Sequence, residues 1–138
     1  YADIACLKNS YERVRQLETA LASNIDDRQG RFIPYIQLHE FEALIFADPR
    51  QLDWEYLEHD AQIQNLIAVA KGQEPELIND GRDTAPSKRI IAEIPEYKKA
   101  TAGVAIVEKI GMLTLRAKCK HFNEWVSQLE SLAGVSHE

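Results

Sequence analysis

Three ionisable side chains, His39, Glu40 and Glu42, stand within the largely apolar stretch from Ile33 to Phe46. If the whole stretch were one helix, the two glutamates would point about 200° apart and could not share a ligand. If instead a strand ends at Glu40 and a helix begins after it, both carboxylates lie at the strand's carboxyl end, where open α/β sheets bind ligands. There they would suit Mg²⁺ or Mn²⁺. A simpler alternative stays open, in which both glutamates complement the helix dipole and His39 caps a backbone group.

A second candidate site lies in the segment NDGRDTAPSKRI, residues 79–90. Pro86 suits the first turn of a helix, which places Ser87, Lys88 and Arg89 where exposed N–H groups favour an anion. We therefore predict that these three residues bind phosphate and that Lys88 stabilises its charge during catalysis. The glycine pattern of a Walker A loop is absent. The alternative is a capped surface helix whose basic residues face solvent and whose preceding polar residues only form turns.

Charge is unevenly distributed along the chain, although the net charge is −6. Residues 1–81 carry 7 basic and 15 acidic side chains, whereas residues 82–120 carry 9 basic and 4 acidic ones. This division is either a chance grouping of solvated faces or an acidic metal-binding edge opposite a basic phosphate-binding edge. A further basic run consists of Arg116, Lys118, Lys120 and His121. It is either a solvated helix end or a contact with a nucleic-acid backbone.

Helices and one strand are expected to position these residues. Asn9 followed by Glu12 resembles a capping box, and apolar residues then recur at helical spacing over residues 10–24. The segment of residues 32–38 is short, apolar and rich in β-formers, which predicts a strand.

Trp54 and Trp125 lie at apolar helical positions and are expected in the core rather than as base-stacking groups. Further helices are predicted for residues 41–47, 52–70, 86–93, 104–110, 113–118 and 122–132, with a loop at 73–86.

The predicted fold class is α/β and α-rich, with its principal strand at about residues 32–38. One strand cannot satisfy its own backbone groups, so a second chain, a preceding segment or an unrecognised strand must supply the partners. The length of 138 residues favours a single domain, 1–138, and we expect it to be a fragment that lacks N-terminal strands. No apolar run approaches the roughly 18 to 20 residues of a membrane span, so the expected location is cytoplasmic, with no membrane partner.

Three blocks of sequence resemble the later part of a bacterial family catalogued as domain-of-unknown-function family 4276. They are RFIPYIQLHEFEALIFADP, ELINDGRDTAPSKRI and IPEYKKATAGVAIVEKIGMLTLRAKCKHFNEWVSQLESL, and together they span most of residues 31–132. Complete members of that family begin with a strand and an EGxTE-type motif followed by an acidic strand end, a pattern similar to Toprim domains, which hold Mg²⁺ for phosphodiester chemistry. Neither motif occurs here, which implies that this chain corresponds to the C-terminal portion of such a protein.

The similarity to Toprim domains implies a Mg-dependent Toprim-like nuclease or phosphotransfer protein. Such proteins are often encoded beside ATPases in phage-defence loci, which implies a role in phage defence. Glu40-Phe41-Glu42 resembles an E-x-E feature of Toprim-like nucleases of the overcoming-lysogenization-defect type, which supports Glu40 and Glu42 as catalytic and metal-binding residues. We expect nucleic acid and an ATPase as partners, and enzymatic activity only in the intact protein. The alternative function is a non-catalytic helical interaction module that packs on a catalytic half or on the ATPase. The sequence leaves open whether the chain forms a homo-oligomer.

Overall fold

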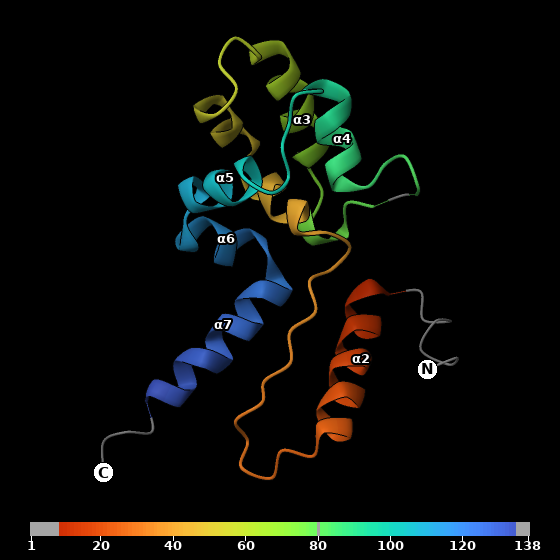
Figure 1. Ribbon diagram of the computed structural model, residues 1–138, viewed down its shortest axis with the longest axis vertical. Coiled ribbons are helices and arrows are strands. Elements are labelled where there is room, and N and C mark those ends of the chain that lie inside the picture. Colours follow the sequence, from red (N-terminus) through yellow and green to blue (C-terminus); the bar gives the residue numbers. More distant parts are fainter. Residues whose placement is uncertain (1–8, 80, 135–138) are drawn as a thin grey trace. The chain divides into compact units, whose positions relative to one another are not determined.

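The computed structural model describes residues 9–79 and 81–134, and all regular elements in these ranges are helices (Figure 1). The predicted helix-rich character is therefore confirmed. The chain divides into two compact units, residues 1–38 and residues 39–138. In the described part of the chain, no helix has the length and apolar character needed to cross a membrane.

The first unit is built on helix α2, Ser10–Ile25, which confirms the helix predicted over residues 10–24. Its start is fixed by Asn9, whose side-chain oxygen accepts a hydrogen bond of 2.9 Å from the N–H of Tyr11. This bond satisfies one of the N–H groups that the first helical turn leaves without a partner. Tyr11 and Val14 are buried against Leu38, and Ile36 packs against this small cluster.

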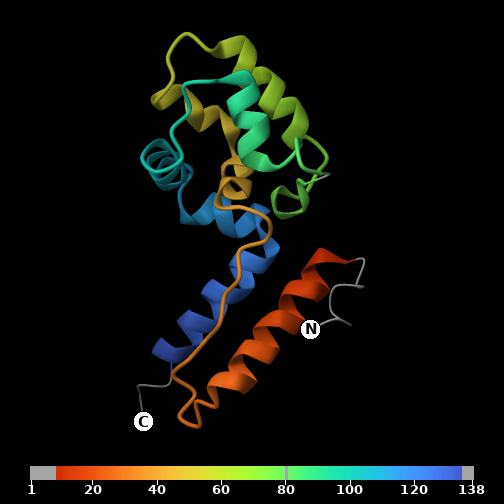
Figure 2. The ribbon, with the colours of Figure 1, turned by 45° about the vertical axis from the view of Figure 1, so that its right-hand side comes forward.

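The strand predicted at residues 32–38 is not present, so the α/β fold class is not supported. This segment has no regular structure, and the ribbon passes through it as a long loop (Figures 1 and 2). The N–H of Ile36, which a sheet would pair with a neighbouring strand, donates instead to Glu18 Oε1 at 2.7 Å. A β-forming composition describes a preference, whereas a strand also needs partner backbone groups. No strand in the described ranges supplies them.

The second unit contains three 3-10 helices and five α-helices within its described residues. The 3-10 helix η1 confirms the predicted helix at residues 41–47, and α4 begins and ends at the predicted residues. The elements are η1 Phe41–Ala47, η2 Pro49–Trp54, α3 Asp60–Ala70, η3 Pro75–Leu77, α4 Pro86–Glu93, α5 Ala102–Ile110, α6 Met112–Lys118 and α7 Lys120–Ala133.

Helix η1 forms the centre of this unit. Six of its residues, 42–47, are buried, and it contacts α3, α4, α5 and α6. Helices α3 and α4 lie side by side (Figures 1 and 2). The core around η1 is formed by Leu44, Ile45, Phe46, Leu52, Ile63, Leu66, Ile78, Ile90, Ile94, Tyr97, Ile106, Ile110 and Leu115, among others. Helices α3, α4, α5 and α6 therefore pack around η1.

The helix predicted over residues 52–70 is divided into η2 and α3 by residues 55–59. Glu58 has a positive φ of 64°, a conformation that cannot continue a right-handed helix. The break changes which side chains share a face, so the helical spacing that predicted a buried Trp54 no longer applies. Trp54 is 66% exposed, and its ring lies 4.6 Å from Lys109 Nζ. The prediction of Trp54 as a core residue is therefore wrong, whereas Trp125 is partly buried beside Phe122.

Candidate functional site

Glu40 joins the start of η1 to the first turn of α4. It occupies the residue before η1, in extended conformation, and its carboxylate reaches Ser87, 47 residues later in the chain. Ser87 donates twice, from its N–H to Oε2 at 2.8 Å and from its hydroxyl to Oε1 at 3.0 Å. Lys99 Nζ lies 3.5 Å from Oε1. Three positively polarised groups therefore hold one carboxylate.

The N-terminus of α4 needs an acceptor from elsewhere because it cannot cap itself. The residue before the helix is Ala85, which has no side-chain acceptor, and Pro86 follows at the first helical position. N–H groups in a first helical turn carry partial positive charge and favour an anion. Glu40 supplies that anion. At this helix end, where the sequence predicts a bound phosphate, the structure has a carboxylate of the same chain.

The surroundings of Glu40 keep it ionised. Burial by itself raises the pKa of the Glu40 carboxyl, but the two hydrogen bonds from Ser87 and the charge of Lys99 outweigh burial, so that its pKa lies below the ordinary value. The side chain is 28% exposed. Each carboxylate oxygen can accept more than one hydrogen bond or ligand. Glu40 is therefore an oriented, negatively charged group that solvent can still reach.

Glu42 faces a different part of the core. It lies in the first turn of η1, is 5% exposed and accepts a long hydrogen bond of 3.4 Å from the hydroxyl of Tyr97. Burial and the nearby charge of Glu42 raise the pKa of Tyr97 above its ordinary value, so this phenol stays protonated. Gly103 in α5 leaves room for the phenol, because a Cβ at this position would come within 2.7 Å of the Tyr97 hydroxyl oxygen. The two predicted metal ligands thus have separate partners.

His39 and Asn79 connect the start of η1 to the loop after η3. His39 adopts a left-handed conformation with φ of 58°. The side-chain amide of Asn79 lies 2.9 Å from His39 Nδ1, and its carbonyl oxygen accepts a hydrogen bond of 3.3 Å from the N–H of Gly81. Asn79 is therefore a turn residue, one of the roles that the sequence left open for it. Asp80 lies outside the described residues.

The three predicted phosphate-binding residues differ in their surroundings. Both donors of Ser87 are used by Glu40, and Arg89 Nε donates to the Thr84 carbonyl at 2.7 Å, which holds the loop before α4. Lys88 is exposed and makes no hydrogen bond or ion pair to any described residue. Of the three, Lys88 is thus the residue placed to meet an anion from solvent.

Glu40 could bind a divalent metal ion only together with further ligands from other groups. Among the described residues, no three His, Cys, Asp or Glu side chains are grouped so that they could hold a metal ion. Mg²⁺ is commonly bound by one or two carboxylates together with waters and substrate phosphates. Glu40 suits such a role because it is ionised, oriented and partly exposed, whereas Glu42 is buried.

Comparison with known proteins places the chain in a family. Residues 1–130 match the family model described as Domain of unknown function (DUF4276). The chain belongs to this family. No curated protein and no solved structure matches it. The three sequence blocks pointed to the same family, and this family assignment is therefore confirmed.

A further buried carboxylate of this DUF4276 chain, Glu76, lies in the segment that the sequence predicts as a loop. It is fully buried in η3, and its two oxygens accept hydrogen bonds of 2.9 Å from the N–H groups of His121 and Phe122 in the first turn of α7. Burial and, after it, the charge of Glu76 raise the pKa of Cys119 to about 12, so this thiol stays protonated. The signal in the sequence is indirect, because Cys119 precedes the helix and is a poor N-cap.

Proposed function

We propose that this chain contributes to a Mg²⁺- or Mn²⁺-dependent Toprim-like nuclease or phosphotransfer protein that acts in phage defence. Support comes from membership of the DUF4276 family, from the resemblance of Glu40-Phe41-Glu42 to the E-x-E feature of Toprim-like nucleases, and from the state of Glu40. The observation that carries the proposal is that Glu40 is ionised, fixed by Ser87 and Lys99, and 28% exposed.

Each residue has a distinct role in this proposal. Glu40 offers an oxygen ligand to the metal ion, and the other protein ligands come from outside the described residues. Glu42 and Tyr97 form a buried pair that positions η1 and with it Glu40. Lys88 is exposed in the first turn of α4, and its ammonium group would neutralise a phosphate bound at that helix end. The bound metal would polarise the phosphate and help to activate a water molecule.

A helical interaction module is the second candidate, and one observation favours it. Met112 and Leu113, consecutive residues at the start of α6, are 54% and 87% exposed. Burying two such side chains against a partner would be favourable by roughly 1.5 to 3 kcal/mol each. The partner in this case is the catalytic half of the protein or its ATPase.

Cleavage of DNA or RNA by the full-length protein tests the first proposal. With Mn²⁺ present, Glu40→Gln should reduce cleavage by at least about tenfold, because it keeps the shape of the side chain and removes the charge of a metal ligand. Lys88→Ala should lower the salt dependence of nucleic-acid binding by about one unit of slope. The matched control is Glu108→Gln, which changes an exposed carboxylate on α5. Unchanged cleavage by Glu40→Gln would leave the interaction module as the better account.

A further inference from the structure

The segment of residues 53–60, DWEYLEHD, combines exposed apolar and exposed acidic side chains. Trp54 and Leu57 are 66% and 71% exposed, and among the described large hydrophobic side chains only Leu113 is more exposed. Neither Trp54 nor Leu57 belongs to the core or to the Glu40 site. Apolar surface that is bordered by polar residues marks interaction sites in soluble proteins.

The backbone of this segment is firmly held. Leu52, just before it, is fully buried, and its carbonyl accepts a hydrogen bond of 3.0 Å from the N–H of Tyr56. The Tyr56 hydroxyl accepts another of 3.0 Å from the N–H of Lys98. The indole Nε1 of Trp54 donates to Gln51 Oε1 at 3.0 Å. A surface that is already ordered loses little conformational entropy when a partner binds.

Trp54 and Leu57 both lie beside α5. Lys109, in the last turn of α5, places its Nζ 4.6 Å from the centre of the Trp54 ring. Leu57 lines a pocket of about 520 Å³ together with Thr101 and Ala102, at the start of α5. Eight helical positions, from 101 to 109, span about 12 Å. The two apolar side chains therefore lie near opposite ends of α5, at a separation that about two turns of a partner helix would bridge.

The acidic side chains of the segment are free to meet a cation. They are Asp53, Glu55, Glu58 and Asp60. All four are exposed, and none forms a hydrogen bond or ion pair through its carboxylate with a described residue. The segment contains no lysine or arginine, and its histidine, His59, already faces the Glu96 carboxylate at 2.6 Å. Four uncompensated negative charges thus border Trp54 and Leu57.

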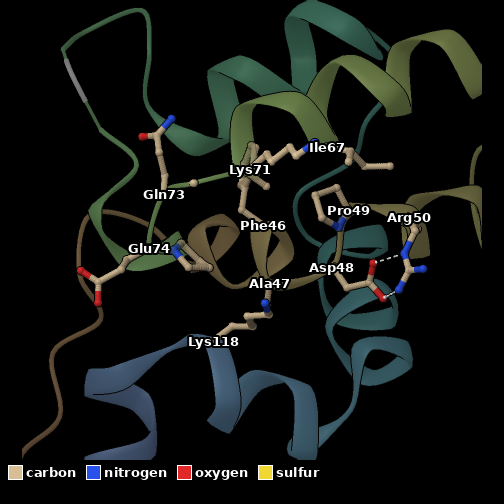
Figure 3. A pocket seen from close by; sticks show the side chains of 13 residues that line it. Phe46, Ala47, Asp48, Pro49, Arg50, Ile67, Lys71, Gln73, Glu74 and Lys118 are labelled. Carbon is tan, nitrogen blue, oxygen red and sulfur yellow. Dashed lines mark hydrogen bonds and ion pairs between the residues drawn. The ribbon is translucent and has the colours of Figure 1, made fainter.

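Basic side chains nearby offset only part of this charge. Arg50 is occupied by Asp48, to whose two oxygens it donates at 2.7 and 3.0 Å (Figure 3). Lys98 lines the pocket beside Leu57, and Lys109 lies over the Trp54 ring. Two lysines therefore stand against four carboxylates, and the surface stays acidic. Such a charge repels phosphate groups, whether of nucleic acid or of an anionic membrane, and attracts basic groups.

We propose that residues 53–60 bind a basic amphipathic helix of a partner protein. Apolar side chains of that helix cover Trp54 and Leu57, and its lysines or arginines pair with the four carboxylates. Neither Glu40, Lys88 nor a metal ion takes part in this binding. The inference therefore stands independently of the proposed nuclease activity.

Calorimetric titration of the full-length protein with synthetic peptides tests the proposal. The probe is an amphipathic helical peptide of about 15 residues made of leucine and lysine, and its control carries glutamate in place of every lysine. The lysine peptide should bind with a Kd of roughly 10 to 100 μM at low salt. The glutamate peptide should bind at least about tenfold more weakly, because its charges are repelled.

Variants of the segment assign the binding to these residues. Trp54→Ala should weaken binding of the lysine peptide by at least about tenfold, and Glu55→Lys by about threefold to tenfold. The matched controls are Leu132→Ala and Glu74→Lys, which change an exposed apolar and an exposed acidic side chain outside the segment and should leave the affinity unchanged. The peptide contains no tryptophan, so its binding should shift the protein's fluorescence to shorter wavelength. Trp54→Phe should abolish this shift.

Four results would overturn the proposal. They are no binding of the lysine peptide at millimolar concentration, equal binding of the glutamate peptide, an affinity that Trp54→Ala leaves unchanged, and self-association or single-stranded DNA binding that Trp54→Ala abolishes. The last result would assign the surface to a second copy of the chain or to nucleic acid. The first two come from the unmodified protein, so they do not depend on the folding of a variant. Because the peptide titration contains no metal, its failure is distinguishable from failure of the metal-dependent cleavage.

Discussion

Glu40 has a structural role that is compatible with the chemical role proposed for it. Its hydrogen bonds with Ser87 fix the start of η1 on α4, and the same bonds, with the charge of Lys99, keep it ionised. A carboxylate that is already deprotonated and oriented loses little freedom when it takes a further ligand. The helix-capping and metal-binding interpretations of Glu40 are therefore compatible at the level of the residue.

At the same scale, His59 should titrate above its ordinary pKa. Its Nδ1 lies 2.8 Å from the Leu57 carbonyl oxygen, and its Nε2 lies 2.6 Å from Glu96 Oε1. Both neighbours are acceptors, so both ring nitrogens must donate, which requires the charged imidazolium. The hydrogen bond to Leu57 and the charge of Glu96 raise the pKa of His59 above 6.5, against the opposing effect of burial.

The sign of the resulting pH dependence follows from this raised pKa. The folded protein binds the proton of His59 more tightly than the unfolded chain, so the contribution to stability is complete below pH 6.5 and is lost as the pH rises through the folded-state pKa. NMR titration of the ring protons should give a midpoint above 6.5, and Glu96→Gln should lower that midpoint. A wild-type midpoint at or below 6.5 would contradict this assignment.

At the scale of elements, the five α-helices described in the second unit begin without a capping side-chain hydrogen bond, and distant carboxylates supply acceptors to two of them. Ala85 precedes α4 and Cys119 precedes α7, and neither residue caps its helix with a side-chain hydrogen bond. Glu40 and Glu76 supply acceptors to these two helix N-termini from positions more than 40 residues away. Distant carboxylates thus replace local caps and connect elements that are far apart in the sequence.

Replacement of Glu76 should destabilise the protein more than replacement of an exposed glutamate. Glu76→Ala removes a fully buried carboxylate that accepts hydrogen bonds from two N–H groups of α7, which should lower the free energy of unfolding by roughly 2 to 4 kcal/mol. Glu108→Ala, on the exposed face of α5, should change it by less than about 0.5 kcal/mol. Urea unfolding monitored by circular dichroism measures both. Equal effects of the two substitutions would show that the Glu76 hydrogen bonds contribute little.

Local signals predicted the helices well because those signals act within a few residues. The Asp48-Pro49 pair ends η1 where expected, and Pro86 begins α4 where expected. The strand at 32–38 failed because a strand depends on partners that composition cannot reveal. Trp54 failed because the interruption at Glu58 uses a backbone conformation for which the sequence contains no glycine or proline signal.

The candidate site was predictable in its residue types and not in its pairings. Glu40, Glu42 and Ser87 were recognised from their positions at expected element boundaries. The contact of Glu40 with Ser87 joins residues 47 positions apart, and Glu42 and Tyr97 are 55 apart. Such contacts depend on how the helices pack around η1, which spacing along the chain does not determine. For the same reason, an anion at α4 could be expected while its identity as Glu40 could not.

At the scale of the whole molecule, the candidate site belongs to the unit formed by residues 39–138. This unit also contains the basic segment 82–120, which includes Lys88, Lys99 and Lys118. The chain as a whole carries a net charge of −6. Binding of nucleic acid would therefore depend on this local concentration of basic groups rather than on the overall charge. The expectation of a single domain stays a prediction, as does its status as a fragment.

Binding of Mn²⁺ to the full-length protein tests the central claim most directly, because it examines Glu40 without any assumption about the substrate. Electron paramagnetic resonance of free Mn²⁺, recorded during titration, gives the affinity for the wild type, for Glu40→Gln and for the control Glu108→Gln. We predict that Glu40→Gln weakens Mn²⁺ binding by at least about tenfold while the control binds as the wild type does. Unchanged Mn²⁺ affinity of Glu40→Gln, together with a lowered thermal stability, would contradict the claim and leave Glu40 as a helix-capping group.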